Sequence, residues 1–154
     1  MTDETQGVHR SFVTVEVAGE TFGIAIERVR EVFTPDRLTH VPLAPHEIAG
    51  VLNLRGRIVT AVDMRSRLGL PRRDEADKPM AIGIDHRQEA FALLVDRVGD
   101  VLDLPADGQE APPTSLDPRW IHVAEGVYRL DSRLLLILNV ERALDTQSAL
   151  AAAA

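Results

Sequence analysis

The sequence of 154 residues contains no cysteine. This absence excludes disulfide bonds and metal sites built on thiolates. No apolar run approaches the ~20 residues that a membrane-spanning helix needs. The polar first ten residues lack the apolar core of a secretory signal peptide. We therefore expect a cytoplasmic protein with no segment inserted directly into a membrane.

Positive charge is also in short supply. The chain has 17 lysine and arginine residues against 24 acidic ones, which gives a formal net charge of −7, and Lys78 is its only lysine. Binding to nucleic acid relies on clustered cations that neutralise phosphates. We therefore expect no nucleic-acid partner.

Motifs that carry enzyme chemistry are missing as well. No glycine-rich phosphate loop precedes a predicted helix, and there is no nucleophile motif. The five histidines have neither the i, i+4 spacing on a helix nor the cysteine partners that a zinc site would use. Asp63 stands where it can cap a helix, which explains it without catalysis. The sequence therefore predicts no enzymatic activity, no metal site and no cofactor.

The pattern that is present is mainly an alternation of apolar and polar residues, in a chain that is 45% hydrophobic. Val13, Val15 and Val17 alternate with polar neighbours, and a second alternating segment follows a turn at residues 18–20. This period of two predicts a hairpin with one buried face. Further strands are expected over residues 48–54, 58–62, 80–85, 90–95, 98–104, 126–130 and 134–138. The fold class is therefore all-β.

Short helices are expected at three places. Ile26, Val29 and Val32 recur at helical spacing, which predicts a helix that begins after Ile26. Asp63 and Asn139 each precede a short apolar-periodic run and predict capped helices there. Residues 105–118 contain four prolines and are expected to form a long loop.

The sequence also contains an internal repeat. At an offset of 69 residues, the segment around Phe22 matches the segment around Phe91. At an offset of 76 residues, Gly50 matches Gly126 and Asp63 matches Asn139. Charged and glycine positions match in the same order as the apolar ones, which favours a genuine duplication. The seven-residue difference between the offsets places an insertion in the proline-rich loop.

Each half of the repeat holds about five short strands and a short helix. Such strands close most easily into a small barrel, which removes exposed sheet edges. We predict a flexible N-terminus over residues 1–11, one domain over 12–144, and a tail over 145–154. Within the domain, two closely packed barrels would cover about 12–70 and 80–144, with exchange of terminal strands between them left open.

Three stretches of the chain resemble the CheW domain family. They are Ile26–Val32 (IERVREV), Val41–Pro45 (VPLAP) and Gly50–Arg65 (GVLNLRGRIVTAVDMR), and the last contains the family's NLRG core. The resemblance runs from about Phe12 to Leu144. It implies two SH3-like five-stranded barrels and a scaffold without catalysis. It also implies an adaptor that couples chemoreceptors to a histidine kinase of the CheA type.

The same resemblance names partners and a place in the cell. It implies binding to the regulatory domain of the CheA-type kinase and to the cytoplasmic tips of chemoreceptors. The protein would then be cytoplasmic and recruited to membrane-associated receptor arrays.

The candidate interface combines this resemblance with the repeat. The repeat matches Glu31 with Asp100 and Arg55 with Asp131, so that an acid–arginine pair in one half becomes two acids in the other. Folding alone would not require the first pair, and we predict that Glu31 and Arg55 meet on the surface. The predicted receptor and kinase interface consists of Val29, Glu31, Gly50, Asn53, Arg55 and Gly56.

The sequence is also compatible with other functions. The chain could serve a chemosensory pathway that controls pili or a second-messenger enzyme instead of flagella. It could also be a ligand-binding barrel that uses Arg55 to hold an anion, or a hydrolase built on Asp63 and a histidine. An apolar surface strip would favour the adaptor, and a deep pocket with converging charges would favour the ligand binder.

Overall fold

The computed structural model describes residues 8–74 and 76–145. Most of the predicted flexible N-terminus (1–7) and of the predicted tail (146–154) therefore lies outside the described residues. The first strand begins at His9, inside the segment predicted to be flexible, because His9 pairs with Pro105 of a neighbouring strand.

The strands are β1 (His9–Val17), β2 (Glu20–Ala25), β3 (Glu31–Phe33), β4 (Ile48–Leu54), β5 (Arg57–Asp63), β6 (Met80–His86), β7 (Glu89–Val95), β8 (Arg97–Pro105), β9 (Ala124–Arg129) and β10 (Leu134–Leu138). The helices are η1 (Ile26–Arg28), α2 (Met64–Arg67), η2 (Ala106–Gly108), α3 (Pro118–Val123) and α4 (Val140–Leu144), where η marks a single 3₁₀ turn.

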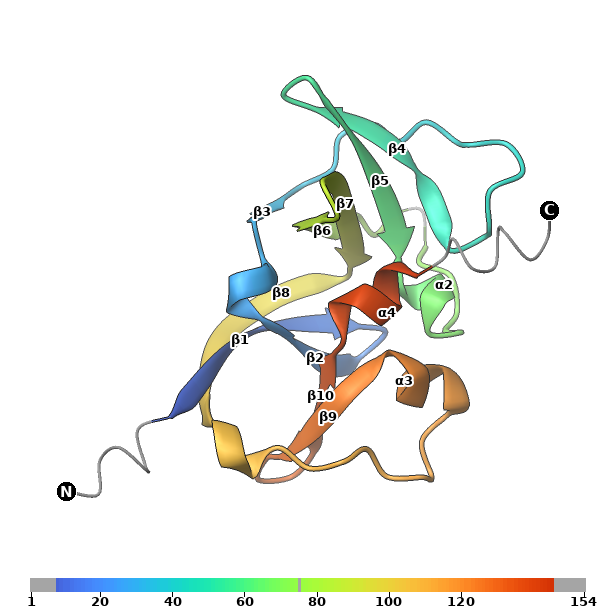
Figure 1. Ribbon diagram of the computed structural model, residues 1–154. Helices are drawn as coiled ribbons and strands as arrows, with labels where there is room; N and C mark the ends of the chain where they lie inside the picture. The colour runs from blue at the N-terminus through green and yellow to red at the C-terminus, as the bar shows by residue number, and fades with distance from the viewer. Residues whose placement is uncertain (1–7, 75, 146–154) are drawn as a thin grey trace.

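The strands form two five-stranded sheets that exchange hairpins. Sheet A has the order β8-β1-β2-β10-β9, and sheet B has the order β3-β6-β7-β5-β4. Each sheet combines the first hairpin of one half of the repeat with the later strands of the other half. The boundaries 12–70 and 80–144 therefore do not enclose one sheet each. Figure 1 shows sheet B above sheet A, with α4 and α2 beside the junction.

The predicted duplication is confirmed strand by strand. The offsets of 69 and 76 residues convert the order of sheet A into the order of sheet B. Each sheet has one parallel pair, β2 with β10 and β7 with β5, and the other neighbours are antiparallel. The predicted caps are matched too, since the side chains of Asp63 and Asn139 accept hydrogen bonds from the first turns of α2 and α4.

The predicted all-β fold of two SH3-like units is confirmed, but the barrels are not closed by continuous strand pairing. β9 and β4 are edge strands, and each is covered by one isolated bridge from the preceding loop. Glu110 bridges to Val127 in sheet A, and Thr39 bridges to Val51 in sheet B. Each half thus protects the same edge with a single bridge instead of a full ladder.

The largest apolar cluster lies between the two sheets and includes residues from both halves. Phe22 and Phe91, which are counterparts in the repeat, both belong to it, as do the fully buried Met64 and Leu68 of the α2 region. Two smaller clusters lie within the individual sheets. Because the main core is shared, neither sheet can bury its inner face without the other.

The short helix predicted after Ile26 is confirmed as one 3₁₀ turn, but the strand that follows it was not predicted. Only the single turn η1 forms there, and the chain then extends into β3, which pairs with β6. Val32 and Phe33 therefore lie on a strand of three residues. A strand that short carries too few residues to show its alternation, so the spacing from Ile26 imitated a helix.

A helix that was not predicted, α3, directly follows the proline-rich region. Asp117 caps α3, whose first residue is Pro118 and whose first turn carries Trp120. The indole N–H of Trp120 donates to the carbonyl of Leu68 at 3.0 Å, and its ring lies 5.3 Å from that of Phe22. The helix thus attaches the inserted segment to the shared core.

One buried polar atom yields a stability prediction. Among the described residues, the hydroxyl of Tyr128 is buried without a hydrogen-bond partner, and burial raises the pKa of this side chain. The repeat places Leu52 at the matching position of sheet B, so the fold does not need a hydroxyl there. Tyr128→Phe should raise the free energy of unfolding by about 1 kcal/mol. Urea denaturation measures this, and a clear loss of stability would contradict it.

Candidate functional site

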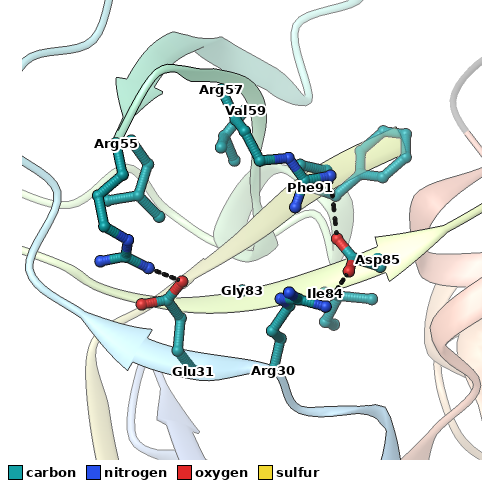
Figure 2. A pocket seen from close by; sticks show the side chains of 11 residues that line it. Arg30, Glu31, Arg55, Arg57, Val59, Gly83, Ile84, Asp85 and Phe91 are labelled. Atoms are coloured by element: carbon teal, nitrogen blue, oxygen red, sulfur yellow. Dashed lines mark hydrogen bonds and ion pairs between the residues drawn. The ribbon is translucent and has the colours of Figure 1, made fainter. Parts of the chain in front are cut away.

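A hollow of about 180 Å³ opens on sheet B at the side where β3 faces the β4–β5 turn. Figure 2 shows its charged side chains converging from β3, β5 and β6. The buried side chains of Val59, Ile84 and Phe91 contribute to its lining. The site therefore combines an apolar floor with a charged rim.

The predicted contact between Glu31 and Arg55 is present at this rim. A guanidinium nitrogen of Arg55 donates to the carboxylate of Glu31 across 24 residues of sequence (Figure 2). Glu31 was expected on a helix but lies on the strand β3. The Arg55 side chain is 69% exposed, so the pair is available to a partner and contributes only about 0–1 kcal/mol to folding.

The turn that presents Arg55 has a demanding backbone conformation. Arg55 and Gly56 have φ values of 51° and 86°, the positive pair that is typical of a type I′ hairpin turn. Asn53 supports this turn, because its side-chain oxygen accepts a hydrogen bond from the Gly56 N–H at 2.9 Å. Of the predicted residues, Asn53 and Gly56 thus shape the turn while Glu31 and Arg55 supply the exposed charges.

Val29 and Gly50, the other two predicted interface residues, do not line the hollow. Val29 is half-buried and packs against the shared core. Gly50 is buried at a β-bulge with φ of 152°, and a Cβ there would lie 2.6 Å from the carbonyl oxygen of Thr39. Gly50 therefore allows the edge bridge to Thr39 and offers no side chain to a partner.

Three further charged residues at the hollow were not predicted. The carboxylate of Asp85 on β6 pairs with Arg30 at 2.6 Å and with Arg57 at 3.5 Å (Figure 2). Arg57 directly follows the turn that carries Arg55, so its position in the sequence could have indicated that it belongs to the site. No sequence signal indicated Asp85 or Arg30, because only the pairing of β3 with β6 brings these two residues together.

A second charge cluster lies where the chain crosses from sheet B to sheet A. Asp96, between β7 and β8, accepts hydrogen bonds from Arg65 of α2, from Arg73, and from the backbone N–H of Ala18 in the β1–β2 turn. Partial burial by itself would raise the pKa of Asp96, but these hydrogen bonds outweigh it and lower the pKa to about 2. The cluster therefore holds the two sheets together.

The described residues contain no group of three or more histidine, cysteine or acidic side chains placed to hold a metal ion. Nor does any helix within 8–74 and 76–145 have the length and apolarity to span a membrane. The Asp63 carboxylate accepts a hydrogen bond from the backbone N–H of Arg65 at 3.0 Å and so serves as a helix cap.

Comparison with known proteins gives consistent results. The family model described as CheW-like domain matches residues 11–148. The chain is 29% identical to the chemotaxis protein CheW of Bacillus subtilis over 132 residues, which cover 86% of this chain and 85% of that protein. It is 28% identical to chemotaxis protein CheW of Klebsiella aerogenes over 140 residues, covering 91% and 84%. The crystal structure of scaffolding protein TtCheW from Thermoanaerobacter tengcongensis superposes with a TM-score of 0.75 at 28% identity, covering 85% and 84%.

Proposed function

The chain belongs to the CheW-like domain family, and from that premise we propose how it acts as a coupling adaptor in bacterial chemotaxis signalling. It joins two kinds of partner without catalysing a reaction. One partner is the regulatory domain of a CheA-type histidine kinase, and the other is the cytoplasmic tip of a chemoreceptor. Binding to both recruits the chain from the cytoplasm to membrane-associated receptor arrays.

The observation that best supports this proposal is the Glu31–Arg55 pair at the rim of the hollow. The repeat replaces it with Asp100 and Asp131 in sheet A, so the fold does not depend on it. Surface arginines are enriched among residues that dominate binding energies. Glu31 and Arg55, with the turn formed by Asn53 and Gly56, therefore make the receptor-facing surface.

A barrel that binds a small ligand through Arg55 is less well supported. The hollow measures about 180 Å³, whereas sites for small organic ligands usually measure about 300–1,000 Å³. Arg55, the residue that would hold an anion, is already paired with Glu31. A surface that presents charges to a protein agrees better with this geometry.

Calorimetry tests the kinase half of the proposal. The purified chain should bind the regulatory domain of the CheA-type kinase from the same organism, with the exposed strand edges of the two domains covering each other. A measurable heat of binding at micromolar concentration is expected. If a folded sample gives no signal at high micromolar concentration, the kinase is not its partner.

A further inference from the structure

The hollow on sheet B has a surplus of positive charge in a chain that is otherwise acidic. Three arginines (Arg30, Arg55, Arg57) converge on two carboxylates (Glu31, Asp85), while the whole chain carries a net charge of −7. Glu31 forms an ion pair with Arg55, and Asp85 forms ion pairs with both Arg30 and Arg57. The charged side chains of the hollow therefore include one more arginine than carboxylate.

Arg57 is the least committed of the three cations. Its guanidinium lies 3.5 Å from Asp85, compared with 2.6 Å for Arg30, and its side chain is 50% exposed. A carboxylate from outside can reach Arg57 without breaking the shorter contact. Figure 2 shows Arg57 reaching down toward Asp85 over the hollow.

The repeat shows that this positive charge is not needed for the fold. In sheet A, the three arginines Arg30, Arg55 and Arg57 are matched by Gly99, Asp131 and Arg133. The two acids Glu31 and Asp85 are matched by Asp100 and Glu16. The same place on sheet A thus has one arginine against three carboxylates. Two sheets with the same topology carry opposite local charge there, so the arginine surplus serves binding instead of folding.

We propose that Arg57, with Arg30 beside it, binds an acidic side chain of the chemoreceptor's cytoplasmic segment in this hollow. The inference rests on the proposed function and specifies which chemistry of the receptor the site accepts. A hollow of about 180 Å³ with a floor of Val59, Ile84 and Phe91 takes one glutamate or aspartate side chain and its aliphatic stem. The incoming carboxylate adds the negative charge that Asp85 alone does not supply.

The test measures binding to a cytoplasmic fragment of a chemoreceptor from the same organism at low and high salt. Arg57→Glu should weaken binding at least about tenfold at low salt, because it places a carboxylate opposite the carboxylate of the receptor. Arg57→Lys should retain most of the affinity. Arg133→Glu makes the same change of charge at the matching position of sheet A and should stay within about twofold of the unchanged chain.

Asp85→Asn gives the proposal a second test with the opposite sign. It frees both arginines, so receptor binding should tighten about threefold. Weakening by Asp85→Asn as well as by Arg57→Glu would show that the cluster only maintains local structure, and would overturn the proposal. Three other results would also overturn it. Arg57→Glu could bind the receptor fragment as tightly as the unchanged chain, or Arg133→Glu could weaken this binding as much as Arg57→Glu does. Arg57→Glu could also weaken binding to the kinase domain but not to the receptor fragment. If the unchanged chain does not bind the receptor fragment, the proposed function fails and this inference fails with it.

Discussion

Asp96→Asn should lower the free energy of unfolding by about 2 to 3 kcal/mol at pH 7, the largest stability loss that we expect from a single polar substitution here. The carboxylate is 15% exposed and pairs with Arg65 and Arg73, whose side chains are 17% and 9% exposed. An amide of the same shape can still accept from Ala18. Among the described residues, it leaves Arg65 without a paired carboxylate, and it leaves Arg73 only Asp63, at 3.8 Å. Chemical denaturation of both chains measures the difference.

The repeat supplies a matched control for this prediction. Glu27 is the counterpart of Asp96 at the other crossover between the sheets, but it is exposed on η1. Glu27→Gln should therefore change stability by no more than about 0.5 kcal/mol. Equal losses from the two substitutions would show that the Asp96 cluster has no special role in joining the sheets.

The same cluster makes stability depend on pH. Asp96 has a pKa of about 2 in the folded protein against a usual value of 3.8, a difference worth about 2 kcal/mol. Because the folded-state pKa is the lower one, the unfolded chain takes up the proton first as the pH falls. The contribution is complete above the usual pKa of 3.8 and is lost as the pH falls through about 2. The difference between Asp96→Asn and the unchanged chain should therefore shrink over that interval and persist at pH 6 to 8.

Arg55→Gly should separate binding from stability. Arg55 has a φ of 51°, which disfavours any residue with a Cβ but suits glycine. Removing the exposed side chain should leave the free energy of unfolding unchanged or raise it by up to about 1 kcal/mol. Loss of an interface arginine should weaken receptor binding by about 2 kcal/mol, or about thirtyfold. Thermal melting and binding to the receptor fragment measure the two effects.

Arg87→Gly is the matched control for that substitution. Arg87 also has a φ of 51° at the first position of a two-residue turn, between β6 and β7 of the same sheet, and it is exposed. It should show the same change in stability and no loss of binding. If both variants bind normally, or if Arg55→Gly unfolds the protein, Arg55 is not an interface anchor.

Much of the fold could be predicted because its signals are local or repeated. Alternation located the hairpins, and Asp63 and Asn139 marked two helix starts. The repeat predicted two equivalent units and led to the Glu31–Arg55 contact. The exchange of hairpins between the sheets could not be derived, because alternation shows which face of a strand is buried but not which strand lies beside it.

The remaining errors have separate physical causes. β3 is too short for its period to be distinguished from a helical one, which misplaced Glu31. α3 was missed although Asp117 and Pro118 are a typical helix start, because the surrounding prolines favoured a loop. Asp85 could not be assigned to the site, since its contacts with Arg30 and Arg57 exist only through the pairing of distant strands.

A chain that couples a receptor to a kinase should be required for receptor control of that kinase. The most direct measurement is the autophosphorylation rate of the CheA-type kinase in the presence of receptor-containing membranes, with and without the purified chain. We predict that the kinase is strongly activated only when the unchanged chain is present, and that Arg55→Gly restores little of this activation. A kinase that reaches the same rate without the chain would show that the chain is not the coupling adaptor.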